Sequence, residues 1–274
     1  MAIDFSSLPA YLRKFLLSLW AGWKITSNWT EPFIFMVYLI VKPLSSVLIL
    51  VVMFYVITGK FTGEQLLFIY IGNAFFSIIR SGISSVWVIT EDREWFETIK
   101  PIFISPGSYL SHILGRTSAE FLFSTFSSLI LLVAGFFVLK LPLGINLPLF
   151  VSTILLTLII TTILALLFCS VAFFVGHGGE FIVEGASGFL YLFSGIIFPA
   201  STLPTFLRVI AEANPITHLT NLFRASLKVS AIPQVEFWKF YLLSFIILAI
   251  SYFIFNRALR LALKTGMLDQ KLGH

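Results

Sequence analysis

Charged residues are scarce in this chain of 274 residues: Asp, Glu, Lys and Arg together make up 11% of it, whereas hydrophobic residues make up 58%. Soluble domains carry roughly 25% charged residues, so the composition excludes an ordinary soluble protein. The mean hydropathy of +0.98 indicates a polytopic membrane protein instead. No polar stretch reaches the length of a soluble domain, ~50 residues or more, and we expect one membrane domain over residues 1–274.

Cysteine and histidine are also rare. The single cysteine, Cys169, lies inside an apolar run and forms no disulfide framework, and the four histidines are too scattered to make a metal cluster. We therefore expect this chain to bind no metal and no cofactor. The net charge of +5 fits basic loops on one side of a membrane, and no basic face or aromatic-basic module predicts a nucleic-acid partner.

A nucleotide-binding P-loop is missing as well. That loop needs the pattern G-x-x-x-x-G-K-[ST], in which backbone amides hold the phosphates. The pair Gly59-Lys60 is followed by Phe61 and has no glycine five residues before it. We expect that the chain does not hydrolyse ATP and that it is not an enzyme.

Six apolar segments have the length of a membrane span, about 20 residues. They are Pro32–Thr58, Leu66–Ile89, Phe121–Leu139, Leu147–Val175, Phe181–Phe198 and Phe237–Phe255. The predicted fold class is thus an all-α membrane protein with six transmembrane helices. Lysine and arginine number ten at one set of span ends and six at the other. Because cytoplasmic ends are enriched in these residues, both termini are predicted to be cytoplasmic.

An amphipathic segment precedes the first span. Its apolar side chains share one helical face, with Arg13, Lys14 and Lys24 away from that face. The apolar set is Leu8, Leu12, Phe15, Leu16, Leu19 and Trp23. This pattern predicts an interfacial helix over residues 5–25, lying along the cytoplasmic leaflet. An ordinary packing helix is the alternative, although the sequence offers no soluble core for it.

The segment 199–230 is interrupted too often to be a span. Pro199, Pro204 and Asn214-Pro215 divide it into short amphipathic pieces, and Arg224 follows them. Irregular backbone at membrane depth persists only where protein surrounds it or where it lines a cavity. We therefore predict short re-entrant helices before the last span, as is typical of proteins that move a substrate across a bilayer.

Two stretches of this sequence resemble the membrane subunit of an ABC-2 type exporter. The first is S-G-I-I-F-P-A-S-T-L-P-T-F-L-R-V-I-A-E-A-N-P-I-T-H, from Ser194 to His218. The family commonly reads Ser-Gly, aromatic-Pro, Leu-Pro, a short amphipathic helix, Asn-Pro and a distant arginine, here Arg224. The second is E-T-I-K-P-I-F-I-S-P, from Glu97 to Pro106, preceded by an acidic run. Glu97 stands where the family usually has glycine, and Lys100-Pro101 also departs from the family pattern.

The resemblance implies a homodimer of this chain, bound to two copies of a separate ABC ATPase that carries the ATP and Mg²⁺. The complex would lie among the lipids of the plasma (inner) membrane of a prokaryote and export a drug, lipid, glycolipid or lipid-linked polysaccharide. A cytoplasmic helix over residues 91–106 would transmit closure of the ATPase to the spans. The residues expected to couple the subunits are Glu91, Asp92, Glu94, Glu97 and Thr98. Alternatively, these carboxylates only solvate the start of a helix, where they favour its dipole.

Two basic residues lie inside predicted spans. Lys42 is ten residues into the first span and Arg80 is ten residues before Thr90. At 1.5 Å per residue, both lie about 15 Å from the cytoplasmic ends. A basic side chain near mid-bilayer costs at least ~2.5 kcal/mol and normally faces a cavity. Lys42 and Arg80 are thus candidates for meeting an anionic substrate group in the translocation path. The alternative is that they snorkel to the headgroups, or pair with Glu120 or Glu184.

Another motif suggests a different class of function. Gly185-Ala186-Ser187-Gly188 resembles the nucleophile motif of rhomboid intramembrane proteases. Such a protease needs a histidine on a later span, and His218 and His274 lie outside the predicted spans. Small residues that let helices approach closely explain the motif without chemistry. A membrane scaffold with neither activity is the third alternative.

Overall fold

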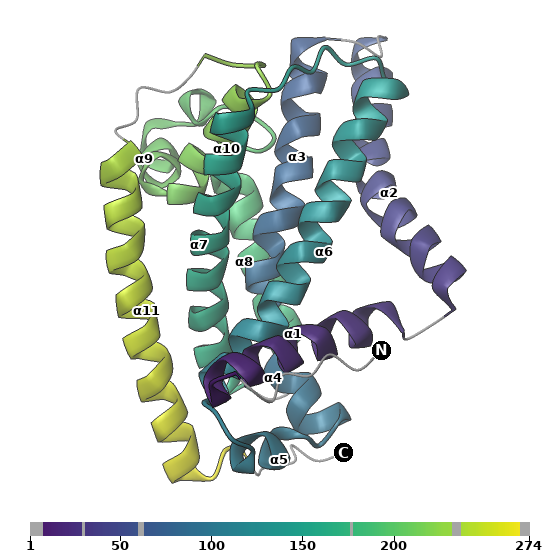
Figure 1. Ribbon diagram of the computed structural model, residues 1–274. Coiled ribbons are helices and arrows are strands. Elements are labelled where there is room, and N and C mark those ends of the chain that lie inside the picture. The colour runs from purple at the N-terminus through teal and green to yellow at the C-terminus, as the bar shows by residue number, and fades with distance from the viewer. Residues whose placement is uncertain (1–7, 29–30, 60–62, 176–177, 232–236, 269–274) are drawn as a thin grey trace.

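The computed structural model describes residues 8–28, 31–59, 63–175, 178–231 and 237–268. Every regular element within these ranges is helical, as predicted (Figure 1). In chain order the elements are α1 Ala10–Ser27, α2 Pro32–Thr58, α3 Glu64–Ile83, α4 Val86–Thr90, the π-helical turn η1 Glu91–Trp95, α5 Ile99–Ile104, α6 Tyr109–Phe137, α7 Leu147–Ala172, α8 Gly179–Phe193, the 3-10 turn η2 Ala200–Thr202, α9 Thr205–Ala213, α10 Pro215–Ser226 and α11 Phe237–Thr265.

Five described helical stretches are long and apolar enough to cross a membrane. They are Pro32–Ile57, Glu64–Trp95, Tyr109–Phe137, Leu147–Ala172 and Trp238–Thr265. In Figure 1, α2 and α11 form opposite flanks of the bundle, with α3, α6 and α7 between them. The flanking helices expose many large apolar side chains, such as Ile49 and Phe253, which a membrane would cover.

The predicted fifth span, Phe181–Phe198, is helical only to Phe193. At 1.5 Å per residue, the 15 residues of α8 measure about 22 Å, less than the ~30 Å hydrocarbon core. The helix ends early because Gly195 takes a positive φ of 62°. The turned carbonyls of Gly195 and Ile196 both accept hydrogen bonds from the guanidinium of Arg224.

Two clusters of buried apolar side chains hold the bundle together. One gathers around Phe75 and Phe223, where α3, α7 and α10 meet. The other gathers around Ile89, Ile113 and Phe173, towards the opposite end. The continuous stretch of α3 and α4 contributes to both clusters and is therefore the central column of the fold.

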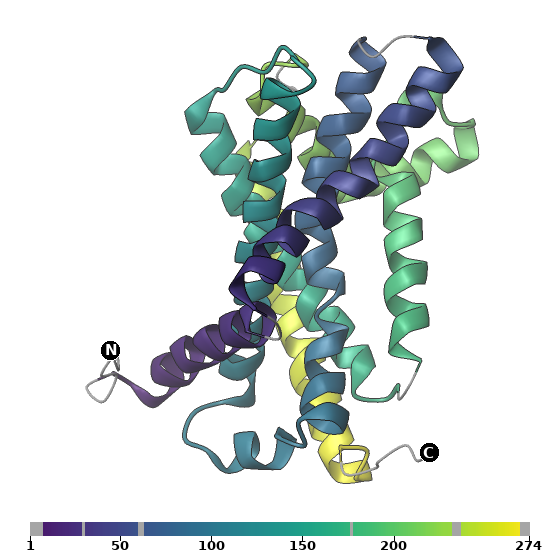
Figure 2. The same cartoon turned by 90° about the vertical axis from the view of Figure 1, so that its right-hand side faces the viewer.

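Helix α1 lies across the direction of the spans, at the same end of the molecule as α5 and the last turns of α11 (Figures 1 and 2). Its buried face is formed by Lys14, Ser18 and Gly22, spaced four residues apart and packed on α6. Large apolar side chains such as Leu12 and Trp23 are exposed instead. The amphipathic helix predicted over 5–25 is present from residue 10 and continues to Ser27, and its predicted apolar side chains are partly or fully exposed; residues 5–7 lie outside the described ranges.

Helices α9 and α10 lie at the other end of the molecule (Figure 1). The predicted breaks are in place: η2 follows Pro199, α9 follows Pro204, and Asn214 separates α9 from α10. Asn214 caps α10 by accepting a hydrogen bond from the Ile216 N–H at 3.0 Å. Pro215 then occupies the first helical position, where its missing N–H costs nothing.

We predict that Gly72→Ala destabilises the protein. A Cβ atom at Gly72 would lie 2.5 Å from the Ile196 carbonyl oxygen and 2.6 Å from Arg224 Nη2. Overpacking of this kind costs about 1–3 kcal/mol, so thermal unfolding in detergent should begin several degrees lower. Gly185→Ala is the matched control, because nothing lies within 4 Å of a Cβ there. Equal melting temperatures for the two variants would contradict the tight contact.

Candidate functional site

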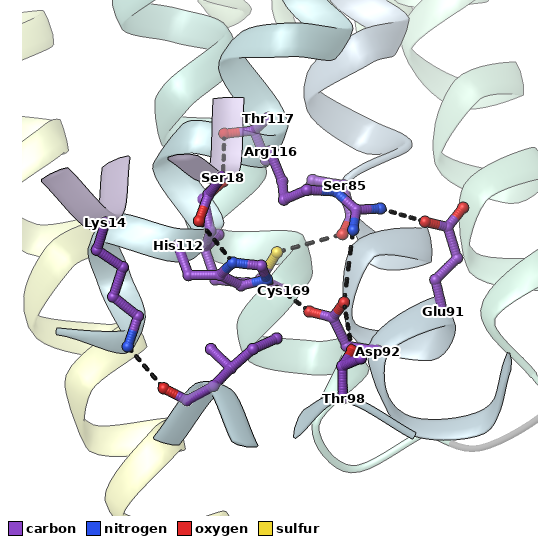
Figure 3. Close-up of polar contacts among 12 residues, drawn as sticks. Lys14, Ser18, Ser85, Glu91, Asp92, Thr98, His112, Arg116, Thr117 and Cys169 are labelled. Carbon is purple, nitrogen blue, oxygen red and sulfur yellow. Dashed lines mark hydrogen bonds and ion pairs between the residues drawn. The ribbon is translucent and has the colours of Figure 1, made fainter. Parts of the chain in front are cut away.

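A group of polar side chains is buried where α1, η1 and α6 meet (Figure 3). At its centre is the Asp92 carboxylate, in a residue that is 1% exposed. Asp92 Oδ2 lies 2.7 Å from His112 Nε2, and Oδ1 accepts hydrogen bonds from Thr98 Oγ1 at 3.3 Å and Arg116 Nη1 at 3.5 Å. We call the following residues the Asp92 cluster: Ser18, Glu91, Asp92, Thr98, His112 and Arg116.

Both carboxylates of the Asp92 cluster share one arginine. Arg116 pairs with Glu91 through its second terminal nitrogen while it also contacts Asp92. Buried ionic groups are tolerated only when they are paired and hydrogen-bonded, and removal of one partner leaves an uncompensated charge. The cluster therefore fixes the start of the 91–106 segment to α6.

Helix α1 is fastened to α6 at the same place. Ser18 Oγ lies 2.8 Å from His112 Nδ1, so the cluster reaches α1 through the imidazole. The two helices also approach very closely, because a methyl group at Gly115 would overlap the Phe15 carbonyl oxygen. Gly22 and Ala119 also approach closely, about one turn further along both helices. Small residues thus set the position of α1 more strongly than its leucines do.

Lys14 joins α1 to the far end of the 91–106 segment. Its ammonium donates to the carbonyl oxygens of Ile102 at 2.6 Å, Gly107 at 3.1 Å and Ser105 at 3.5 Å. These carbonyls lie at and beyond the C-terminus of α5, where a helix leaves acceptors unpaired and favours a positive charge. Burial lowers the pKa of Lys14 from its usual value. The 91–106 segment is therefore tied to the bundle at both ends.

The segment predicted as one helix over 91–106 is divided into η1 and α5. Glu97 stands between them with a positive φ of 52°, a conformation that favours glycine. This explains why a glycine would suit the position. Of the predicted coupling residues, Asp92 and Thr98 bond each other, Glu91 pairs with Arg116, and Glu94 pairs with Arg93. The exposed surface of the turn consists of Trp95, Phe96 and Glu97.

The chain Ser18–His112–Asp92 has the connectivity of a hydrolase triad. All three residues are buried, with exposures of 5%, 6% and 1%, and none of them lines either described cavity. A substrate cannot reach the serine hydroxyl, so the chain serves to join α1 to η1. Ser187 gains no such partner either, because the described histidines are engaged elsewhere: His112 in the Asp92 cluster and His218 with the Glu212 carbonyl.

A cavity of about 750 Å³ lies between α2, α3, α6 and α8. Three of these helices each turn a stripe of polar residues towards it. The stripes are Asn73, Ser77 and Arg80 on α3, continued by Ser84 directly after it; Glu120, Ser124 and Ser127 on α6; and Glu184, Ser187 and Tyr191 on α8. Helix α2 contributes an apolar wall that includes Phe35, Leu39 and Leu50. The cavity is therefore amphipathic, with room for a drug-sized molecule.

The spacing of these polar residues is the signal that sequence reasoning missed. Steps of three, four and seven residues place side chains on one face of a helix, and they recur in three separate apolar segments. Arg80 was predicted, and its Nη2 forms an ion pair with Glu184 Oε1 at 2.5 Å across the cavity. Lys42 belongs to α2 between two lining residues, but its side chain is outside the described part of the structure.

At the opposite end, Arg224 holds the segment that follows α8. The residue is 1% exposed, and its guanidinium donates to the carbonyl oxygens of Gly195 at 2.8 Å, Ile196 at 3.0 Å and Phe68 at 3.1 Å. The guanidinium carbon lies 3.4 Å from the centre of the Phe68 ring. One side chain therefore joins α10, α3 and the turn after α8.

These features define a multi-pass helical membrane protein with an amphipathic cavity between its helices and a crosswise helix at one end. A family model described as ABC-2 type transporter matches residues 13–228, which is well over half of the chain. The chain belongs to this family and is a transmembrane component of an ABC transporter, a membership that implies an ABC ATPase partner. None of the curated proteins compared with the chain matches it.

We predict that Lys14→Met loosens the 91–106 segment without unfolding the bundle. The variant loses three hydrogen bonds to carbonyls, so amide hydrogen exchange should become faster over residues 99–107. Lys24→Met is the control, because Lys24 is exposed on the same helix. Unchanged exchange in Lys14→Met would show that other contacts hold α5.

We predict that Arg224→Lys lowers stability almost as much as Arg224→Met. A lysine has no planar fork: its three N–H donors share one nitrogen, whereas Arg224 uses two separate nitrogens to reach Gly195 on one side and Phe68 and Ile196 on the other. Each buried carbonyl that loses its donor costs about 1–3 kcal/mol. The measurement is the melting temperature in detergent, with Arg208→Lys as the control at an exposed position of α9. Full stability of Arg224→Lys would mean that the charge alone is required.

Proposed function

We propose that this chain is the membrane subunit of an ATP-driven exporter. Two copies of the chain work with two copies of a separate ABC ATPase, which binds ATP and Mg²⁺. The substrate path runs through the cavity between α2, α3, α6 and α8, and the cargo is hydrophobic or amphiphilic. The α1 end of the molecule faces the cytoplasm of a prokaryotic cell, and α9 and α10 lie at the outer side of the plasma membrane.

The amphipathic cavity is the observation that carries this proposal. Polar residues inside membrane spans are expensive and usually line a path or a site. Here the polar residues of three helices line one cavity. The Arg80 side chain, which pairs with Glu184 in that cavity, is 47% exposed. An ion pair so open to its surroundings needs water or a second subunit over it. The chain belongs to a family of transporters, so the simplest role for this cavity is to hold the transported substrate.

A six-span topology follows if α8 crosses the membrane together with the turned segment after it. Helix α8 alone is too short to cross the hydrocarbon core. Beyond its C-terminus, however, α10 packs against α3 and α7 and lengthens the protein at that end. Because Arg224 satisfies the carbonyls of this segment, irregular backbone is acceptable at membrane depth. The short helices α9 and α10 are then re-entrant, as the prolines of the sequence suggest.

The ATPase binds at the turn formed by Trp95, Phe96 and Glu97. Trp95 is 66% exposed and Phe96 45% exposed, at the tip of a segment that is tied at both ends. Exposed aromatic side chains on a rigid support are typical anchors of protein interfaces. Glu91 and Asp92 act indirectly, by holding the turn through Arg116 and His112, whereas Glu94, Glu97 and Thr98 stay at or beside the contact surface.

We expect Trp95→Ala to weaken ATPase binding about tenfold, the size of a single interface anchor. The tagged chain is purified in mild detergent, and the P-loop ATPase that comes with it is identified and titrated back. Phe206→Ala is the matched control, because this exposed aromatic residue lies on α9 at the other end.

Two results would overturn the proposal at different levels. Unchanged binding by Trp95→Ala, with the same melting temperature as the parent, would move the docking surface away from this turn. Recovery of the parent chain without any ATPase, combined with loss of a proteolytic activity in Ser187→Ala, would replace the transporter subunit by a protease.

A further inference from the structure

The charges that line the cavity do not cancel within the described residues. Arg80 is neutralised by Glu184, its ion-pair partner. Glu120 remains, and the contact described for its carboxylate is a hydrogen bond from Thr26 Oγ1 at 2.9 Å. A hydroxyl does not neutralise a carboxylate, so the cavity presents a negative group on α6 that has no cation among the described side chains.

Aromatic residues line the same cavity as this carboxylate. Phe123 lies one turn further along α6, on the face of Glu120, and it also lines the cavity. Its ring meets Phe35 of α2 edge-on at 5.6 Å and stacks on Trp23 of α1 at 4.3 Å. Phe123 is buried beneath Trp23, whereas Phe35 is partly exposed, so Phe35 is the ring that a bound organic cation can face through its quadrupole.

A second polar group in the cavity is also without a partner. The hydroxyl of Ser187 belongs to a residue only 5% exposed, lines the cavity and has no hydrogen-bond partner within the described structure. Buried hydroxyls are nearly always hydrogen-bonded, so that of Ser187 is available to a polar group of a molecule bound in the cavity. The apolar wall of α2 offers a surface for the hydrophobic part of such a molecule.

We infer that the cavity binds an amphiphilic organic cation, with Glu120 as its counter-charge and Phe35 of the α2 wall beside its positive group. This inference rests on the proposed function, since it takes the cavity as the substrate path. It reverses the expectation that Arg80 meets an anionic substrate, because the Arg80 guanidinium already has a carboxylate partner.

The test compares two ions of the same shape and opposite charge, tetraphenylphosphonium and tetraphenylborate. Binding of each is measured by equilibrium dialysis to the full chain with its ATPase in nanodiscs, with empty nanodiscs as the blank. We expect the cation to bind at least tenfold more tightly than the anion. Glu120→Gln should lose that preference, while Glu120→Asp, which keeps the charge, should retain most of it.

Glu64→Gln is the matched control, because Glu64 is an exposed carboxylate at the start of α3 and does not line the cavity. Equal binding of the two ions, or a preference that survives in a folded Glu120→Gln, would overturn the inference. The rate of ATP hydrolysis by the same complex is measured as well, so that a failure of this inference can be told apart from a failure of the proposed function. Hydrolysis stimulated by the anion would disprove only the cationic cargo, whereas a chain that has no ATPase partner would disprove the transporter itself.

Discussion

The buried carboxylate of Asp92 joins three parts of the chain that are distant in sequence. It contacts Arg116 and His112 of α6, and through His112 it reaches Ser18 of α1. Because an unpaired carboxylate in an apolar interior is costly, these partners must stay in place as long as Asp92 is buried. The turn that carries Trp95 therefore cannot move without taking α1 and the start of α6 with it.

The other end of the molecule is held by a buried charge of the opposite sign. Arg224 has backbone carbonyls as partners instead of carboxylates, so it fixes the course of the chain after α8 as well as the position of α10. The cavity lies between these two fixed ends, and its apolar wall is α2, whose side chains are among the most exposed of the bundle. The candidate span that is least buried in the described structure thus borders the space through which we propose that cargo passes.

Much of this fold can be predicted from the sequence, because its helices begin and end where local chemistry dictates. The run from Pro32 to Thr58 is a helix with those bounds, and the prolines at 204 and 215 start new helices as expected. The end of α8 could not be predicted, since it depends on Arg224, about 30 residues later in the chain. The packing face of α1 was also hidden, because close approach at Gly22 and Gly115 outweighs the apolar side that the pattern emphasises.

The candidate site was predictable only in outline. The acidic run marked the right segment, but the sequence did not tell that Asp92 turns inward, because its partners come from α6. Arg80 was correctly placed inside a span, and its pairing with Glu184 was among the alternatives. The serine stripes on α3 and α6 could not be assigned to a site from the sequence, because a single hydroxyl in a helix indicates no function and only the structure shows that the stripes line the same cavity.

The most direct measurement is the distance between α1 and α5 before and after ATP binds to the complex. Spin labels at Leu17→Cys and Ile104→Cys report it, and Cys169 is buried away from the reagent. A label at Leu261→Cys on α11 provides the reference. If the Asp92 cluster and Lys14 make one rigid unit, the Leu17–Ile104 distance stays constant while the Ile104–Leu261 distance shifts. A Leu17–Ile104 distance that changes as much as the reference would show that the coupling turn moves independently of α1.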